Sequence, residues 1–287
     1  MPEDENRTES SQRGVHVTRV GDGQAQAASP DFVAVEEPLE IRIGQSEGGR
    51  PKHQAVSITM RTPGHDFELA AGFLCTEGIL KSRDQVAGIE HCGHGPSLTN
   101  TVRVDLVAGV AVDVKRLERN FYTTSSCGVC GKTSLEALAT GATRVVAAPG
   151  FQVEARVIHA LPAKLRERQR TFEHTGGLHA AAFFSNTGEL LGLREDVGRH
   201  NAVDKLIGSR FLAGTLPARE DILFLSGRAS FELLQKAVMA GVPMVCAVGA
   251  PSSLAVEAAN EFGVTLLGFV RDNRYNIYSG ADRISGP

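Results

Sequence analysis

The stretch DILFLSGRASFELLQKAVMAGVPMVCAVGAPSSLAVEAANEFGVTLLGFV, residues 221–270, decides the fold class. Its apolar runs, at 222–225, 244–248 and 265–270, are predicted strands, and the segments 231–240 and 254–262 between them have helical periodicity. Gly241 is placed to end the first helix and Pro243 to open the next strand. Continuous apolar strands joined by helices are typical of a parallel sheet covered on both faces, so we expect an α/β fold.

Two turns in this stretch lead from a strand into a helix, namely Ser226-Gly227-Arg228-Ala-Ser230 and Gly249-Ala-Pro-Ser-Ser253. Gly and Ser leave backbone N–H groups free at a helix N-terminus, and this geometry suits phosphate. Arg228 in the first turn, with Arg271 and Arg274 after the last strand, adds guanidinium groups for bidentate phosphate contacts. Neither turn matches the G-x-G-x-x-G or the Walker pattern, which disfavours an ordinary dinucleotide and ATP hydrolysis.

The chain before this α/β unit divides into a tail and a β-rich domain. Residues 1–29 are rich in Glu, Ser, Gln and Gly with few apolar pairs, so we expect a disordered tail. Residues 30–120 are predicted to form a β-rich N-terminal domain, with one helix beginning at Asp66 and running to Leu80. Its predicted strands alternate polar and apolar residues, at 32–35, 39–43, 56–60 and 101–106. The α/β domain then spans residues 121–287.

Composition excludes several classes of protein. The 287 residues are 42% apolar and 22% charged, as in ordinary globular proteins. A formal net charge of −3 gives no basis for general nucleic-acid or membrane-surface binding. The odd count of 5 cysteines, without a secretory or membrane-spanning stretch, indicates free thiols in a reducing cytoplasm. Cys75 and Cys246 fall on apolar segments and are expected in the core.

Cys127 and Cys130 lie in Tyr122-Thr-Thr-Ser-Ser-Cys-Gly-Val-Cys-Gly-Lys132, a run of small and hydroxyl residues. A polar loop with glycines is a poor place for a packing cysteine, which behaves as a small hydrophobe. A helix is predicted over residues 132–139, and its N-terminus would favour thiolate over thiol. Four interpretations of the pair compete: half of a structural zinc site, a thioredoxin-like redox pair, a zinc deaminase motif and a sulfur carrier.

The residues weaken two of these interpretations. A zinc site needs a second pair of ligands, and His91, Cys92 and His94 do not form a repeated knuckle. Zinc deaminases carry P-C-x-x-C together with H-x-E, whereas here Ser126 replaces the proline and His179 is followed by two alanines. We therefore predict no metal site. The context differs from that of thioredoxin, but the residues alone do not separate a redox pair from a sulfur carrier.

Polar residues also gather between the cysteines and the parallel unit. Glu195-Asp-Val-Gly-Arg-His-Asn201 is a predicted turn before a helix over 202–207, and capping by Asp196 or Asn201 would explain it. Its density of charge also suggests a group that orients a ligand or tunes a thiol. The charge run of the basic amphipathic helix predicted over 153–169 is usually a solvated face, although such helices also serve as docking surfaces. His179 fits equally a satisfied core histidine and a group facing the cysteine loop.

Four stretches, in the same order, resemble the formate dehydrogenase accessory sulfurtransferase family between Asp31 and Tyr278. They are Ser126-Cys-Gly-Val-Cys-Gly131, Glu195-Asp-Val-Gly-Arg-His-Asn-Ala-Val-Asp-Lys205, Ser226-Gly-Arg-Ala-Ser-Phe-Glu232, and Thr265-Leu-Leu-Gly-Phe-Val-Arg271 with Asn276-Ile-Tyr278. The resemblance implies a cytidine-deaminase-like layered α/β domain without deaminase chemistry. It also implies a cytoplasmic homodimer.

The resemblance further implies a sulfurtransferase that takes persulfide sulfur from a cysteine desulfurase. The sulfur would pass to the molybdenum (or tungsten) bis(molybdopterin guanine dinucleotide) cofactor before that cofactor enters formate dehydrogenase. A guanine nucleotide would then mimic the bound cofactor. The alternative is a zinc-binding or redox-active accessory module for the dehydrogenase that transfers no sulfur.

The site residues that follow from the resemblance and the turns fall into two groups. Cys127 is the expected persulfide carrier, and Cys130 assists release or protects the carrier. The candidate cofactor-binding residues are Phe269, Val270, Arg271, Asp272, Asn273, Arg274, Ser226, Gly227, Arg228, Arg199 and His200. The turn 249–253 departs from the Ser-Ala-Pro-Thr expected in the family.

Overall fold

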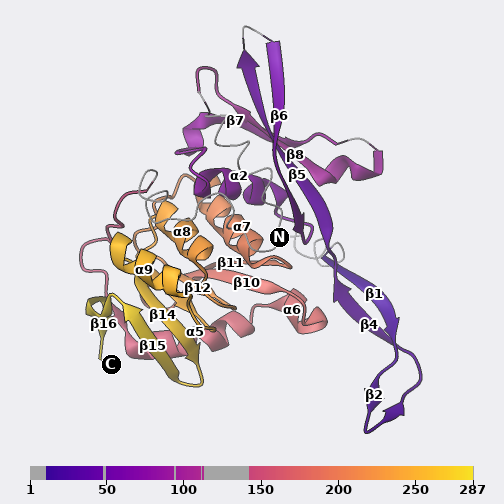
Figure 1. The fold of residues 1–287 in the computed structure, drawn as a ribbon, viewed down its shortest axis with the longest axis vertical. Coiled ribbons are helices and arrows are strands. Elements are labelled where there is room, and N and C mark those ends of the chain that lie inside the picture. Colours follow the sequence, from indigo (N-terminus) through magenta and orange to yellow (C-terminus); the bar gives the residue numbers. More distant parts are fainter. Residues whose placement is uncertain (1–10, 48–49, 94, 111, 113–141, 287) are drawn as a thin grey trace.

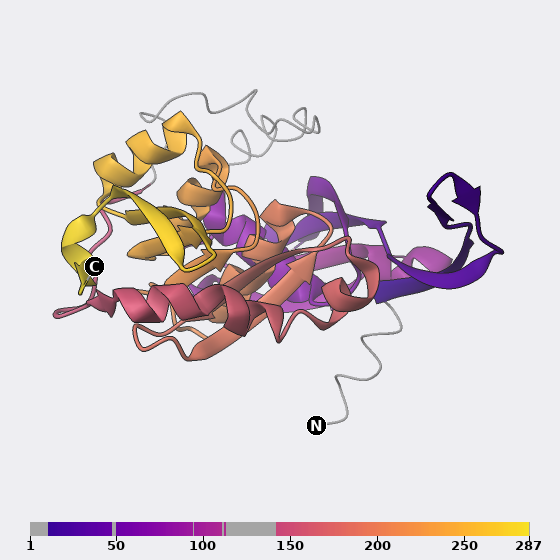
Figure 2. The same ribbon diagram turned by 90° about the horizontal axis from the view of Figure 1, so that it is seen from below.

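The computed structural model describes residues 11–47, 50–93, 95–110, 112 and 142–286. Within them the protein is a mixed α/β structure built in layers (Figure 1). A 4-stranded sheet made of the N-terminal half lies over helix α2, and a 6-stranded sheet made of the C-terminal half lies beneath α7, α8 and α9. Helix α5 covers the far face of the larger sheet (Figure 2).

The larger sheet has the order β11-β10-β12-β13-β14-β15. Its strands are β10 (His179–Phe184), β11 (Leu190–Asp196), β12 (Ile222–Leu225), β13 (Met244–Ala247), β14 (Thr265–Arg271) and β15 (Arg274–Ser279). Strands β12, β13 and β14 run parallel, with Ile222 opposite Met244 and Met244 opposite Thr265. The parallel unit predicted from the apolar runs is therefore confirmed, and antiparallel strands flank it on both sides.

Helices cover both faces of this sheet because its central strands are apolar on both sides. Leu223 and Leu225 pack with α7, α8 and α9, while Ile222 and Phe224 pack with α5 on the opposite face. The helices are α5 (Ala155–Arg166), α6 (Arg170–Thr175), α7 (Arg199–Leu212), α8 (Phe231–Met239) and α9 (Ser253–Phe262). Helix α8 ends before Gly241, which takes a left-handed φ of 71°, as its sequence predicts.

The smaller sheet has the order β6-β5-β8-β7 and packs on α2 (Asp66–Thr76). Its strands are β5 (Glu37–Glu47), β6 (Arg50–Arg61), β7 (Val86–His91) and β8 (Thr101–Leu106). Helix α2 is shorter than predicted, because Gly78 turns left-handed with φ 71° and its N–H bonds back to the carbonyl of Cys75. The N-cap is His65 rather than Asp66.

Short elements complete the described chain. They are the strands β9 (Val153–Glu154) and β16 (Ile284–Ser285), which pair with each other, and the 3-10 helices η1 (Arg83–Gln85), η2 (Gly95–Asn100) and η3 (Ala281–Arg283). The boundary predicted near residue 120 lies outside the described residues. The two larger sheets take their strands from opposite sides of it.

The N-terminal segment differs from the predicted disordered tail. Residues 11–29 belong to a hairpin arm that projects from the body (Figure 1), made of β1 (Gln12–Val17), β2 (Val20–Gly21), β3 (Gln24–Ala25) and β4 (Ser29–Ala34). Asp22 and Gly23, with φ 51° and 76°, form the two-residue turn at its tip. Asp-Gly is a strong hairpin signal, but the prediction for this segment relied on its polar composition and did not use it. Residues 1–10 lie outside the description.

The layers meet where α2 crosses α7. A Cβ atom placed on Gly72 would lie 1.8 Å from the carbonyl oxygen of Asp204, and one on Gly208 would lie 1.8 Å from that of Glu68. The two helices therefore contact each other backbone to backbone, and both positions require glycine. This close crossing fixes the smaller sheet relative to the larger one.

Candidate functional site

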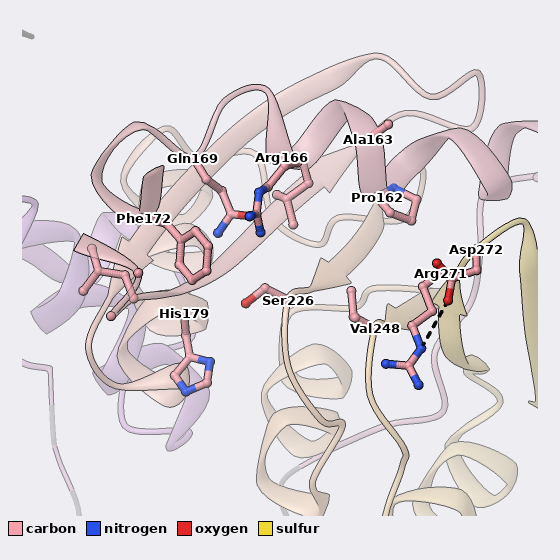
Figure 3. A pocket seen from close by; sticks show the side chains of 14 residues that line it. Pro162, Ala163, Arg166, Gln169, Phe172, His179, Ser226, Val248, Arg271 and Asp272 are labelled. Atoms are coloured by element: carbon pink, nitrogen blue, oxygen red, sulfur yellow. Dashed lines mark ion pairs between the residues drawn. The ribbon is translucent and has the colours of Figure 1, made fainter. Parts of the chain in front are cut away.

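A pocket of about 590 Å³ opens beside the C-terminal ends of β12 and β13 (Figure 3). Helix α5 and the segment that follows it form one wall, and the turn between β14 and β15 forms another. Its polar side chains are Arg166, Gln169, His179, Ser226, Arg271 and Asp272, and its apolar lining includes Pro162, Leu165, Phe172, Leu178 and Val248. The carboxyl ends of parallel strands are where open α/β sheets hold ligands, so this pocket is the candidate site.

Ser226 is the residue of the first predicted phosphate turn that reaches the pocket. Its backbone N–H donates to the carbonyl of Ala180 at 3.0 Å, and its Oγ accepts the N–H of Ala180 at 2.9 Å. The hydroxyl proton of Ser226 therefore remains available to a ligand. Gly227 lies behind it, against the imidazole of His179, and the exposed Arg228 packs on Gly249 outside the described lining of the pocket.

The turn after β14 brings two further predicted residues to the pocket. Arg271 pairs with Arg274 across a two-residue turn, in which Asp272 and Asn273 both have φ 54°. A bulge before the turn, with Phe269 at φ 55°, shifts the register of the two strands. Arg271 and Asp272 consequently line the pocket, with Arg271 Nε 3.9 Å from a carboxylate oxygen of Asp272.

The other predicted residues of this segment have different positions. Val270 is fully buried and packs in the core between the sheet and α5, so it cannot contact a ligand directly. Phe269 shapes the bulge, and its N–H donates to the carbonyl of Gly249 at 3.1 Å. Asn273 and Arg274 are exposed at the turn and are not among the described residues that line the pocket.

The opposite wall is formed by the end of the predicted basic helix and the segment after it, which were not among the predicted site residues. The Arg166 guanidinium carbon lies 4.8 Å from the ring centroid of Phe172, a cation–π contact. Gln169 lies between them in sequence, in the segment that joins α5 to α6, and its side chain is directed into the pocket (Figure 3). Phe172 and Gln169 precede the Gly176-Gly177 turn without any local motif, so only their spatial placement identifies them.

The Glu195–Lys205 segment, by contrast, is used mostly inside the protein. Asp196 is fully buried, with one carboxylate oxygen 2.7 Å from Lys205 Nζ and the other accepting the N–H of Gly198 at 2.8 Å. Lys205 Nζ also donates to the carbonyl of Thr62 at 2.7 Å, and Asn201 donates to the carbonyl of Met60 at 2.7 Å. These contacts anchor the end of β6. The N-cap of α7 is Gly198, so the prediction that Asp196 or Asn201 caps this helix is wrong.

Glu195 supports the pocket from behind. Its carboxylate oxygens accept the N–H groups of Phe172 at 3.0 Å and Thr171 at 3.3 Å, the free donors in the first turn of α6. Burial raises the pKa of Glu195 in spite of these hydrogen bonds. The carboxylate thus holds the short helix that carries Phe172 into the pocket.

Arg199 and His200 are half-buried at the start of α7 and are absent from the described pocket lining. His200 Nε2 lies 2.6 Å from Glu232, and although burial would raise the pKa of that carboxyl, His200 lowers it. Burial lowers the pKa of His179, and the charges of Arg199 and His200 lower it further. Both effects favour the neutral form of the imidazole, and His179 lies half-buried in the pocket wall rather than in the core.

Cys127 and Cys130 lie outside the described residues. Cys75 and Cys246 are buried as predicted, and burial raises the pKa of the Cys75 thiol to about 12 and raises that of Cys246 as well. Neither thiol is therefore a suitable nucleophile.

In the described part of the chain, no group of three or more His, Cys, Asp or Glu side chains could hold a metal ion. No helix among the same residues is long and apolar enough to cross a membrane.

Comparison with known proteins gives consistent matches over most of the chain. The family model described as the FdhD/NarQ family matches residues 34–285. Proteins named sulfur carrier protein FdhD are similar to this chain: that of Streptomyces avermitilis is 51% identical over 274 residues, covering 94% of each chain. The protein of that name from Sulfurisphaera tokodaii is 44% identical over 261 residues, covering 91% of this chain and 94% of its own length.

A solved structure has the same fold. The crystal structure of a protein described as a formate dehydrogenase accessory protein, from Desulfotalea psychrophila, superposes with a TM-score of 0.71 and 22% sequence identity. The match covers 95% of this chain and 99% of that one. At this level of identity the likeness concerns the fold alone.

Proposed function

Because the chain belongs to the FdhD/NarQ family, we propose that it is a sulfur carrier that accepts persulfide sulfur from a cysteine desulfurase. It passes this sulfur to the molybdenum or tungsten bis(molybdopterin guanine dinucleotide) cofactor before insertion into formate dehydrogenase. The observation that carries the proposal is the pocket, in which Ser226 and Arg271 meet Arg166 at the C-terminal edge of a parallel sheet. A guanidinium and a hydroxyl group are suited to phosphate, and the Arg166–Phe172 pair offers a surface on which a base can stack.

The loading step uses Cys127. Its thiolate attacks the terminal sulfur of the persulfide on the desulfurase, so a new S–S bond forms as the old one breaks. The desulfurase cysteine leaves as a thiolate, and the outer sulfur now belongs to a persulfide on Cys127. Thiolate character controls the rate of such exchange, and a helix N-terminus following the cysteines would favour it.

Release requires two electrons if sulfur is delivered as sulfide, and Cys130 supplies them when it acts as a resolving thiol. The thiolate of Cys130 attacks the Cys127 sulfur, expels hydrosulfide and leaves a Cys127–Cys130 disulfide. A cellular dithiol then reduces this disulfide and restores the carrier. The spacing of the two cysteines permits either this role or simple protection of the persulfide.

The pocket suits the nucleotide portion of the proposed cargo. Its volume of about 590 Å³ lies within the range of small-molecule sites, roughly 300–1,000 Å³. The Arg271 side chain is 48% exposed and has only a weak contact with Asp272, so its guanidinium is available for a phosphate. The cargo is larger than one pocket, and a guanine nucleotide such as GDP is the simplest probe of it.

The remaining parts of the proposal concern assembly. We infer a homodimer that acts in the cytoplasm, with the desulfurase and the catalytic subunit of formate dehydrogenase as partners. We also infer that the larger sheet and its helices share the cytidine-deaminase-like layering. Strand β10, which runs antiparallel to both of its neighbours next to the parallel unit, supports that arrangement.

Intact-mass spectrometry tests the carrier assignment. Purified wild type, Cys127→Ala and Cys130→Ala are incubated with a cysteine desulfurase and cysteine, with Cys92→Ala as a control from a half-buried free thiol. We expect wild type, Cys130→Ala and Cys92→Ala to gain the mass of sulfur, removable by a reductant, and Cys127→Ala to gain none.

Two results would contradict the proposal. Sulfur retained by Cys127→Ala and lost from Cys130→Ala would move the carrier role to Cys130. Stoichiometric zinc that disappears in both cysteine variants would replace the sulfur carrier by the zinc-binding accessory module, because a zinc-bound thiolate is not free to exchange.

A further inference from the structure

Gln169 has a side-chain environment that its position in the chain does not explain. The residue is only 5% exposed, and its backbone is engaged on both sides: its N–H donates to Arg166 O at 3.3 Å and its carbonyl accepts the N–H of Glu173 at 3.0 Å. The side-chain amide, however, has no hydrogen-bond partner among the described residues, and it faces the pocket (Figure 3).

The residue is largely buried, but its amide opens into the pocket, so its donors and its acceptor are available to a ligand there. Because the rest of the side chain is held by the fold, a ligand can make these hydrogen bonds without first ordering a mobile side chain. The amide places one acceptor and one donor side by side in a plane, which matches the adjacent donor and acceptor atoms on the edge of a purine base. A phosphate offers acceptors only and would leave the amide carbonyl unpaired.

The neighbours of Gln169 provide a surface for the face of such a base. The Arg166 guanidinium lies over the Phe172 ring, with 4.8 Å between its carbon and the ring centroid, and both line the pocket. Aromatic rings and guanidinium planes are the groups on which bases stack. Arg271 belongs to the opposite wall, which leaves the phosphate groups of a nucleotide at that end (Figure 3).

We propose that Gln169 is the residue of this pocket that recognises the edge of a purine base, while Arg166 and Phe172 contact the face of the base and Arg271 binds the phosphate. This inference rests on the proposed function and deepens it, since it assigns separate residues to the base and phosphate portions of the cargo. Glu195 acts as a positioning residue, because it holds the first turn of α6 through Phe172 and Thr171.

The first test compares GDP with pyrophosphate, which has no base, by titration calorimetry on the full-length protein. Gln169→Leu, which removes the amide at nearly constant volume, is expected to weaken GDP binding about three- to tenfold, the value of one or two hydrogen bonds. Pyrophosphate binding should not change. Arg271→Gln should weaken both ligands, while Arg168→Gln removes a nearby exposed positive charge and should affect neither.

A second variant supplies a readout that a structural role would not produce. Gln169→Glu replaces the donor by a second acceptor, and a carboxylate accepts from the two adjacent N–H donors of guanine but meets an acceptor on the corresponding edge of adenine. We therefore expect the ratio of GDP to ADP affinity to rise in Gln169→Glu and to fall in Gln169→Leu. Melting temperatures of both variants should remain near that of the wild type.

The outcomes separate this inference from the proposed function. Equal losses for GDP and pyrophosphate in Gln169→Leu, or a GDP to ADP ratio that Gln169→Glu leaves unchanged, overturn the role of Gln169. A wild type that loads sulfur on Cys127 but binds neither nucleotide overturns the pocket assignment and leaves the carrier intact. A wild type that binds GDP but loads no sulfur overturns the sulfur carrier and leaves the base-recognition role of Gln169 standing.

Discussion

The Glu195–Lys205 segment and the turn between β14 and β15 both gather charged side chains, but the fold uses them in opposite ways. Asp196 and Lys205 are fully buried, and their charged atoms contact each other and the backbone of Thr62. Arg271 and Asp272 are exposed, contact each other at 3.9 Å and line a pocket. The same density of charge therefore maintains the structure in one segment and remains available to a ligand in the other.

The largest effect expected from this difference concerns Lys205. Lys205→Met leaves the Asp196 carboxylate buried without its partner, and breaking a buried pair in this way costs about 3–5 kcal/mol of unfolding free energy. Urea denaturation at neutral pH measures this loss. Lys81→Met, which removes an exposed lysine, should change stability by less than about 0.5 kcal/mol. Equal stabilities of the two variants would mean that the buried pair is not needed to anchor β6.

A substitution at Gly208 tests how closely the backbones of α7 and α2 pack against each other. Gly208→Ala places a methyl group against the backbone of Glu68, and such overpacking costs about 1–3 kcal/mol, with the upper end expected because backbone cannot rotate away. Gly192→Ala is the matched control, since its Cβ would meet only Leu206 at an ordinary 3.5 Å. A thermal melt that shifts equally for both variants would show that the helix crossing is loose.

The Glu68 carboxyl, which lies in the same region of contact between α2 and α7, should make the unfolding free energy depend on pH. Burial would raise the pKa of this carboxyl, but its hydrogen bonds to Arg194 and His65 lower it to about 2. A lowered folded-state pKa stabilises the protein above the ordinary value of 4.5, and this contribution is lost as the pH falls toward 2. After allowance for solvent screening we expect about 1–2 kcal/mol. The stability gap between wild type and Glu68→Gln should therefore narrow as the pH falls from 5 to about 2; a constant gap would contradict this assignment.

Glu195 belongs by sequence to the buried segment but by contact to the pocket. Glu195→Ala removes the acceptor for two N–H groups of α6, a loss comparable to that of a helix cap, about 1 kcal/mol. Glu195→Gln should cost less, because burial raises the pKa of Glu195 and the folded protein already disfavours its charge. Chemical denaturation measures both costs, and GDP affinity should fall more in the alanine variant. The reverse order would show that the charge itself is required.

The smallest effect on stability is expected at the pocket itself. Arg166 is exposed, so Arg166→Gln should change the unfolding free energy by no more than about 0.5 kcal/mol. GDP affinity should nevertheless fall several-fold, while Arg168→Gln leaves it unchanged. If Arg166→Gln lost stability but kept its GDP affinity, Arg166 would have a structural role like that of Asp196 and Lys205 and would not bind the ligand.

Much of the larger sheet follows from local patterns. The apolar runs that became β12, β13 and β14 lie within a residue or two of their predicted limits, and the helices between them begin and end close to the predicted positions. In the arm, β4 overlaps the strand predicted at 32–35, but β1, β2 and β3 escaped prediction because the composition of residues 1–29 resembles that of a disordered segment. Its pairing depends on the Asp22-Gly23 turn and on backbone hydrogen bonds rather than on an apolar core.

The candidate site also contains residues that could be predicted from the sequence and residues that could not. Ser226 and Arg271 could be predicted, because each follows a strand of the parallel unit and such strands end at one edge of the sheet. Gln169 and Phe172 could not, since their segment has no motif and reaches the pocket only when α5 packs under the sheet. Val270 was predicted at the site, but strand alternation turns its side chain into the core.

The sequence by itself determined the α/β class, the parallel unit, the two buried cysteines and the family, because periodicity, apolar runs and short motifs are properties of neighbouring residues. Only the tertiary structure decided which polar and charged side chains are paired inside the protein and which remain open to a ligand. Asp196 and Lys205 find Thr62 more than a hundred positions away, and Gln169 is left without a partner in the described chain beside a pocket. Such pairings depend on how distant elements pack, and no local pattern records them.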